Sequence, residues 1–137
     1  MSAAMARTQV PVDVVERLRA LCVALPQVRE EGAWVGTRWR VCGKTFVHVL
    51  AIDDGWPPAY AKAAGSRGPL VVMTFRSPRP EAEVHAYTWA PFFRPPWFRD
   101  IVGMRLDAHT DWDEVGACVL ESWRHLAPKS LVAARGA

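Results

Sequence analysis

The chain has 137 residues, of which 50% are hydrophobic and 23% are charged, with a formal net charge of +3. This length and composition predict one globular domain, and they exclude a disordered chain, a disulfide-stapled miniprotein and a collagen-like fibre. No run of about 18 apolar residues is present, and the first residues lack the apolar stretch of a signal peptide. We therefore expect a cytoplasmic protein with no membrane partner.

An amphipathic helix is predicted near the start of the chain, after a flexible tail over residues 1–10. Apolar residues recur there at spacings of four, three and four, which places them on one helical stripe. Pro11 suits the first turn and Pro26 ends the helix. The stripe consists of Val14, Leu18, Leu21 and Leu25.

Five strands are predicted next, and the short connections between them favour antiparallel pairing. Thr45–Ile52 is apolar on both faces, so each face needs a cover. We expect the Trp89–Phe98 segment, or a second copy of the chain, to cover the face that helices leave open. The strands are Ala33–Val35, Thr37–Cys42, Thr45–Ile52, Leu70–Arg76 and one within Phe98–Asp107.

Three further segments complete the predicted fold. Asp53–Pro69 is rich in Gly, Pro and Ala and predicts an irregular loop with a helical turn, and Glu81–Tyr87 predicts a short helix. The last helix begins after Asp111, where Glu114 completes a capping-box pattern, and its stripe includes Val115, Val119, Ser122 and Leu126. Together these elements predict a two-layer α+β domain over residues 11–131, with a five-stranded antiparallel sheet, helices at both chain ends and a flexible tail over 132–137.

Catalytic and metal-binding motifs are missing from the sequence. The histidines are His48, His85, His109 and His125, which are far apart and form no H-E-x-x-H pattern. Cys22, Cys42 and Cys118 form no C-x-x-C pair, which favours reduced thiols. Neither a Walker pattern nor a G-x-G-x-x-G loop is present. We therefore expect a non-enzymatic protein with no metal and no cofactor.

Several short motifs are spread along the chain. They are Leu25-Pro26-x-Val28, Trp39-Arg40-Val41-x-Gly43-Lys44-Thr45-Phe46, Arg105-Leu106-Asp107, Asp111-Trp112-Asp113-Glu114-Val115, Glu121-Ser122-Trp123 and Ala127-Pro128-Lys129-x-Leu131. Together they resemble the MmcQ/YjbR family, over about Val12–Leu131. The resemblance implies a compact α+β domain with a five-stranded antiparallel sheet, of a kind compared with secretion-chaperone-like and frataxin-like folds. It also implies a double-wing DNA-binding function, a label that rests on shape.

The first functional hypothesis is non-specific binding of duplex DNA through basic hairpins. Arg38 and Arg40 share one face of a predicted strand, with Lys44 at the adjacent turn, while Arg76 and Arg79 flank a second turn. Basic side chains at two turns are what a phosphate-gripping wing needs. The alternative interpretation is a solvated hairpin whose charges discourage edge-to-edge aggregation.

The second hypothesis is a protein that binds or sequesters a planar small molecule in a tryptophan-rich cleft. Six aromatic rings lie between Tyr87 and Phe98, and such rings either stack on planar ligands or form a flap over the sheet. His48 would bond such a ligand, or it is a histidine satisfied in the core. The sequence leaves open whether the protein is a monomer or a homodimer. The residues of this cleft would be Trp39, Phe46, His48, Trp89, Phe93 and Trp97.

Overall fold

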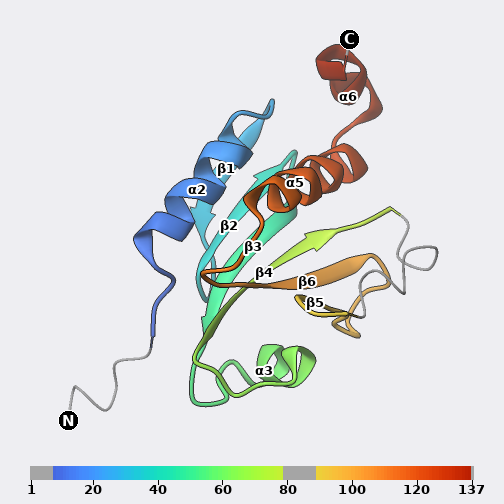
Figure 1. Cartoon of the computed structure of the whole chain (residues 1–137). Coiled ribbons are helices and arrows are strands. Elements are labelled where there is room, and N and C mark those ends of the chain that lie inside the picture. The colour runs from blue at the N-terminus through green and yellow to red at the C-terminus, as the bar shows by residue number, and fades with distance from the viewer. Residues whose placement is uncertain (1–7, 79–88, 137) are drawn as a thin grey trace.

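The computed structural model describes residues 8–78 and 89–136, in which helices pack against an antiparallel sheet (Figure 1). The α+β class is confirmed, but the sheet has six strands, in the order β1-β2-β3-β4-β6-β5, and not the five predicted. The strands are β1 (Val28–Gly32), β2 (Thr37–Val41), β3 (Lys44–Ile52), β4 (Leu70–Arg76), β5 (Phe92–Phe93) and β6 (Ile101–Leu106). The helices are α2 (Val12–Val23), α3 (Pro58–Ala64), α5 (Trp112–Leu126) and α6 (Lys129–Gly136).

The main core lies between the sheet and the two long helices, α2 and α5. Leu18 of α2 and Val115 and Val119 of α5 are buried in one cluster with side chains of the central strands. The other stripe residues Val14, Leu21 and Leu126 are partly buried against the same cluster. The Asp111 carboxylate accepts hydrogen bonds from the N–H groups of residues 113 and 114, so the predicted cap of the last helix is confirmed.

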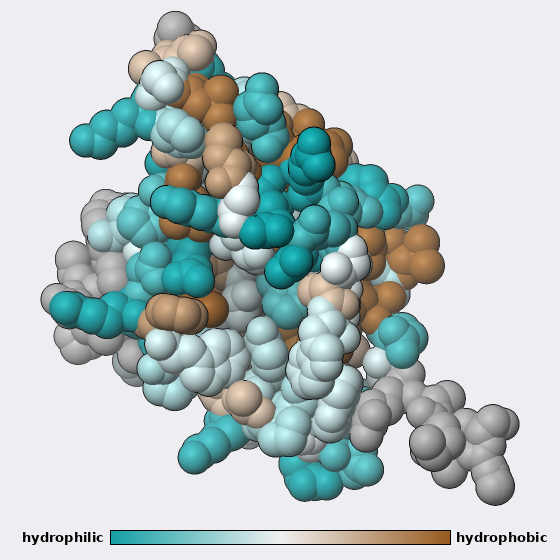
Figure 2. Space-filling view, turned by 180° about the vertical axis from the view of Figure 1, so that it is seen from behind, coloured by the Kyte–Doolittle hydropathy of each residue, from teal (hydrophilic) through white to brown (hydrophobic). Residues whose placement is uncertain are grey.

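A second cluster covers the opposite face of the sheet. Leu50 and Ile52 of β3 pack there with Ala61 and Ala64 of α3 and with Phe93 of β5. The cover is therefore α3, which the sequence showed only as a helical turn, together with part of the Trp89–Phe98 segment. Seen from behind in Figure 2, apolar surface is broken into separate patches between polar side chains.

The first strand lies earlier than predicted. Residues 33–36, expected to contain the strand Ala33–Val35, form a turn in which the Ala33 N–H donates to Gly36 O at 3.0 Å. Gly36 has a φ of 75°, and a Cβ at this position would lie 1.9 Å from Val49 O. The strand is the charged Val28–Gly32, which has little intrinsic strand preference and gains its partners from β2.

The ends of the described chain contact the domain more than the predicted tails imply. The Thr8 N–H donates to the Asp53 carboxylate at 2.8 Å, and Val10 packs against the main core. At the other end, α6 continues to Gly136, beyond the predicted boundary at Leu131. The predicted helix Glu81–Tyr87 lies outside the described residues. Among those that are described, none of the helices combines the length and apolarity needed to cross a bilayer.

A buried hydroxyl ties α5 to two strands. Ser122 Oγ donates to Phe46 O on β3 at 2.6 Å and accepts from the Arg76 N–H on β4 at 2.8 Å. The paired residues of β3 and β4 run from Ile52–Leu70 to Val47–Phe75. Ser122 therefore joins the two strands one residue beyond the Val47–Phe75 pair. The hydroxyl thus satisfies a backbone carbonyl and a backbone N–H that would otherwise lack partners.

We expect removal of this hydroxyl to lower the free energy of unfolding. In Ser122→Ala, Phe46 O and the Arg76 N–H lose their partner, which should lower the free energy of unfolding by about 1–3 kcal/mol. Urea unfolding followed by circular dichroism measures this change. The exposed Ser130 of α6 gives a matched control, and Ser130→Ala should stay within about 0.5 kcal/mol of the parent. Equal stability of the two variants would contradict a bridging role for Ser122.

Candidate functional site

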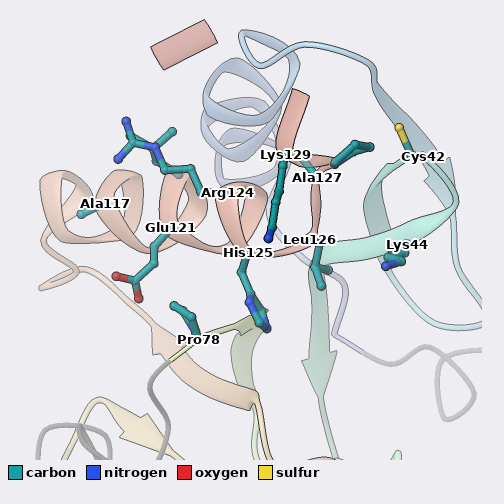
Figure 3. Close-up of a pocket in the computed structure, with 12 residues that line it drawn as sticks. Cys42, Lys44, Pro78, Ala117, Glu121, Arg124, His125, Leu126, Ala127 and Lys129 are labelled. Carbon is teal, nitrogen blue, oxygen red and sulfur yellow. The ribbon is translucent and has the colours of Figure 1, made fainter. Parts of the chain in front are cut away.

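A groove of about 940 Å³ lies at one end of the sheet, between α5, the start of α6 and the β2–β3 turn (Figure 3). Leu126 and Ala127 contribute apolar surface, and Pro78 closes the side next to β4. Five of the lining residues carry ionisable polar side chains. They are Lys44 at the first position of β3, Arg124 and His125 in the last turn of α5, Glu121 one turn earlier, and Lys129 at the start of α6.

Three cations of this groove are available to a ligand. Lys44, Arg124 and Lys129 are exposed, and none forms an ion pair with a residue in the part of the chain that the structure describes. Figure 3 shows the Lys129 side chain extending toward His125. Among the lining residues that the structure describes, these three positive charges face one carboxylate, that of Glu121.

Asp100 lies beside the groove and contacts two partners, Arg76 and His125. Its Oδ1 accepts from Arg76 Nη1 at 2.6 Å, and its Oδ2 lies 3.1 Å from His125 Nε2. Partial burial acts to raise the pKa of Asp100, but Arg76 and then His125 outweigh it and hold this pKa below its ordinary value. The carboxylate therefore stays charged at neutral pH and positions the His125 ring at the wall of the groove.

Arg38 and Arg40, the main predicted DNA contacts, share one sheet face as expected but are already paired. Arg38 Nη2 and Arg40 Nη1 lie 2.6 and 3.1 Å from the same Glu31 oxygen. Glu31 is directly opposite Arg38 on the neighbouring strand, and Arg40 also donates to Gly43 O. Hydrogen bonds from Arg40 and Arg38 lower the pKa of Glu31, so the carboxylate remains charged beside them. Within this group, two positive charges and one negative leave a net +1.

The remaining predicted DNA contacts divide into three cases. Arg76 is paired with Asp100, and its guanidinium carbon lies 4.8 Å from the centroid of the Phe98 ring. Arg79 lies outside the described residues. Lys44 is the predicted contact that the structure places in the groove. The sequence-based prediction missed Arg124 and Lys129 because it considered only basic residues near predicted hairpin turns. Both residues lie close to Pro128, which ends the predicted last helix.

The predicted ligand cleft is not assembled from its six residues. Trp39 and Phe46 are buried in the main core beneath the helices, so neither lines a cleft with His48. The β2–β3 register shifts beside Phe46, because Trp39 pairs with Val47 and Arg40 pairs with Thr45. This bulge breaks the alternation that placed Phe46 on the same face as His48. Trp89 is 72% exposed.

His48 is satisfied by neighbouring protein groups. Its Nε2 lies 2.6 Å from Val35 O, and its Nδ1 lies 3.3 Å from the Tyr60 hydroxyl. Because a carbonyl only accepts, Nε2 carries the proton and Nδ1 accepts from Tyr60. Burial lowers the pKa of His48, which favours this neutral form. The Tyr60 ring in turn contacts Trp97, with centroids 4.7 Å apart.

The described residues do not form a metal-ligand cluster. Within residues 8–78 and 89–136, no group of three or more His, Cys, Asp or Glu side chains is placed to hold a metal ion. Burial raises the pKa of Cys22 and Cys118, the latter to about 12, so neither thiol is activated as a nucleophile. The site is therefore best described by its free cations and by the shape of the groove.

The lowered pKa of Asp100 predicts an acid-sensitive contribution to stability. Its pKa is lower in the folded chain than the unfolded value of about 3.9, so its contacts stabilise the fold above that value. The contribution is lost as the pH falls through the folded pKa. In Asp100→Asn, the free energy of unfolding should therefore depend less on pH between about pH 5 and pH 2. Urea unfolding at each pH measures this, and Asp54→Asn, which alters an exposed aspartate paired with Arg67, is the matched control.

Comparison with known proteins identifies the family. A model of the YjbR family matches residues 23–125, which is more than half of the chain. A crystal structure of a protein from Pseudomonas syringae is similar with a TM-score of 0.59 at 11% sequence identity, covering 82% of this chain and 96% of that one. At this identity the likeness concerns the fold alone, and no curated protein sequence matches. The chain belongs to the YjbR family.

Proposed function

We propose that this protein is a non-enzymatic nucleic-acid-binding protein that holds phosphate groups in the groove between α5, α6 and the β2–β3 turn. The observation that carries the proposal is a set of three cations on one concave surface, Lys44, Arg124 and Lys129, none of which pairs with a residue in the described ranges 8–78 and 89–136. Positive side chains placed along a groove neutralise successive phosphates and release counterions, which is the main source of non-specific affinity. In this proposal the groove cations are the main phosphate contacts, in place of the Arg38 and Arg40 hairpin proposed from the sequence.

The distribution of charged side chains along α5 also favours phosphate binding at the groove. Its first turn carries Asp113 and Glu114, whereas its last turn carries Arg124 and His125. The carboxylates of the first turn repel a polyanion, whereas the Arg124 side chain attracts one to the last turn, beside the groove, and this full charge exceeds the partial negative charge of the helix C-terminus. The Arg38–Glu31–Arg40 group adds a weaker positive charge on the neighbouring strands.

Backbone-directed binding without sequence specificity fits the residues present. Phosphate contacts position a protein on nucleic acid, whereas sequence is read by side chains that reach base edges. The groove offers lysine and arginine groups at the end of α5, at the start of α6 and at the β2–β3 turn, which suit contacts to phosphates. The planar-ligand alternative would have to do without Trp39 and Phe46, which lie in the main core, on the other side of the sheet from Phe93.

Salt-dependent binding tests the proposal. Each phosphate contact contributes about 0.9 to the slope of log affinity against log salt for duplex DNA, so three contacts give about 2.7. Lys44→Ala, Arg124→Ala and Lys129→Ala should each reduce the slope by about one unit, and the triple variant should bind almost no DNA. Fluorescence anisotropy with a labelled oligonucleotide at several salt concentrations measures these slopes.

Two controls identify the groove as the site. Lys62→Ala removes an exposed lysine from α3, away from the groove, and should leave the slope unchanged. Arg38→Ala combined with Arg40→Ala should lower the slope less than the loss of two groove cations, because Glu31 already occupies both arginines. A folded triple variant that binds as the parent does would overturn the proposal, as would a parent that binds no nucleic acid at low salt.

A further inference from the structure

An exposed aromatic ring adjoins the cationic end of the sheet. Phe98, just before β6, is 59% exposed, and the Arg76 guanidinium carbon lies 4.8 Å from its ring centroid. Arg76 is held in turn by Asp100 at 2.6 Å. The ring therefore rests on a fixed cation and keeps more than half of its surface open to a ligand.

This ring is connected to the groove through a short series of contacts. Asp100 binds Arg76 through one oxygen and faces His125 through the other, at 3.1 Å. His125 belongs to the wall of the groove. The Phe98 ring and the groove cations consequently lie on one end of the molecule, joined by the Arg76–Asp100–His125 contacts.

We propose that the preferred ligand is a single-stranded nucleic acid, with its phosphates in the groove and one base stacked on Phe98. This inference rests on the proposed function and names its substrate class. An aromatic ring beside a positively charged groove is the combination that single-strand-binding surfaces use. Stacking tolerates any sequence, because every base has a flat face.

A duplex cannot use this ring in the same way. In a double helix each base is stacked between its neighbours, so its faces are closed to a side chain at the surface of a protein. A single strand exposes these faces at little cost. Phe98 should therefore add affinity for single strands only, whereas Lys44, Arg124 and Lys129 should add affinity for both forms through their phosphates.

A second exposed ring provides a matched control. Trp34 is 79% exposed in the turn between β1 and β2, with its ring centroid 5.3 Å from that of Trp56. Since β1 and β2 pair from Gly32–Thr37 at this turn to Val28–Val41, Trp34 lies at the opposite end of these strands from the groove. Its removal tests whether any exposed aromatic ring would have the same effect.

The experiment compares the parent, Phe98→Ala, Phe98→Tyr, Trp34→Ala and Lys129→Ala in anisotropy titrations at one salt concentration. The probes are a labelled 12-nucleotide single strand of mixed sequence, its duplex, and an otherwise identical strand with abasic sites. The parent should bind the single strand more tightly than the duplex. Phe98→Ala should weaken single-strand binding about tenfold and leave duplex and abasic binding unchanged. Phe98→Tyr and Trp34→Ala should bind as the parent does, and Lys129→Ala should weaken binding to all three probes.

The outcomes separate this inference from the function on which it rests. If Phe98→Ala binds the single strand as tightly as the parent while Lys129→Ala weakens binding, the stacking role is overturned and the phosphate-binding groove stands. If neither variant changes binding, both proposals fail. Urea unfolding of each variant checks that the fold is intact, and Phe98→Ala should retain it because the ring lies at the surface.

Discussion

The position of α5 depends on the hydroxyl of Ser122, which bridges β3 and β4 where their pairing stops. Apolar packing places a helix against a sheet, but the hydrophobic effect has no direction, whereas hydrogen bonds require particular atoms to meet. The two hydrogen bonds of Ser122 set the position of α5 relative to both strands at one point. They also hold the backbone of Arg76, so one buried group positions both a helix and the end of a strand.

The hydrogen bonds of Ser122 also position residues of the candidate site. His125 comes one helical turn after Ser122, and Arg76 has its N–H fixed by the same hydroxyl. Asp100 then connects the Arg76 and His125 side chains. The groove, the guanidinium beneath the Phe98 ring and the last turn of α5 are therefore positioned together. The surface ion pairs add little stability individually, but they fix the directions of long side chains.

Ion pairing also decides which charges a ligand meets. In the sequence, the arginines of the strands appear as the main positive feature, since 17 of the residues are basic and most of these are arginine. In the fold, Glu31 holds Arg38 and Arg40, and Asp100 holds Arg76. Among the described residues of the groove, the cations left available are Lys44, Arg124 and Lys129, which lie at the ends of helices and strands. A basic residue count along the chain therefore overestimates the part of the charge that phosphates can reach.

The sequence by itself determined the long helices, the Asp111 cap and the strands β2, β3, β4 and β6, because periodicity and capping are properties of neighbouring residues. Tertiary structure decided β1, whose charged residues become strand only when β2 supplies their partners. It also decided the bulge that moves Phe46 into the main core, and the cover that α3 gives to Leu50 and Ile52. The same holds for the site: Arg76 and Asp100 are 24 residues apart, and Ser122 lies 76 residues from Phe46. Contacts of this range depend on how the elements pack, and no local pattern in a single sequence specifies them.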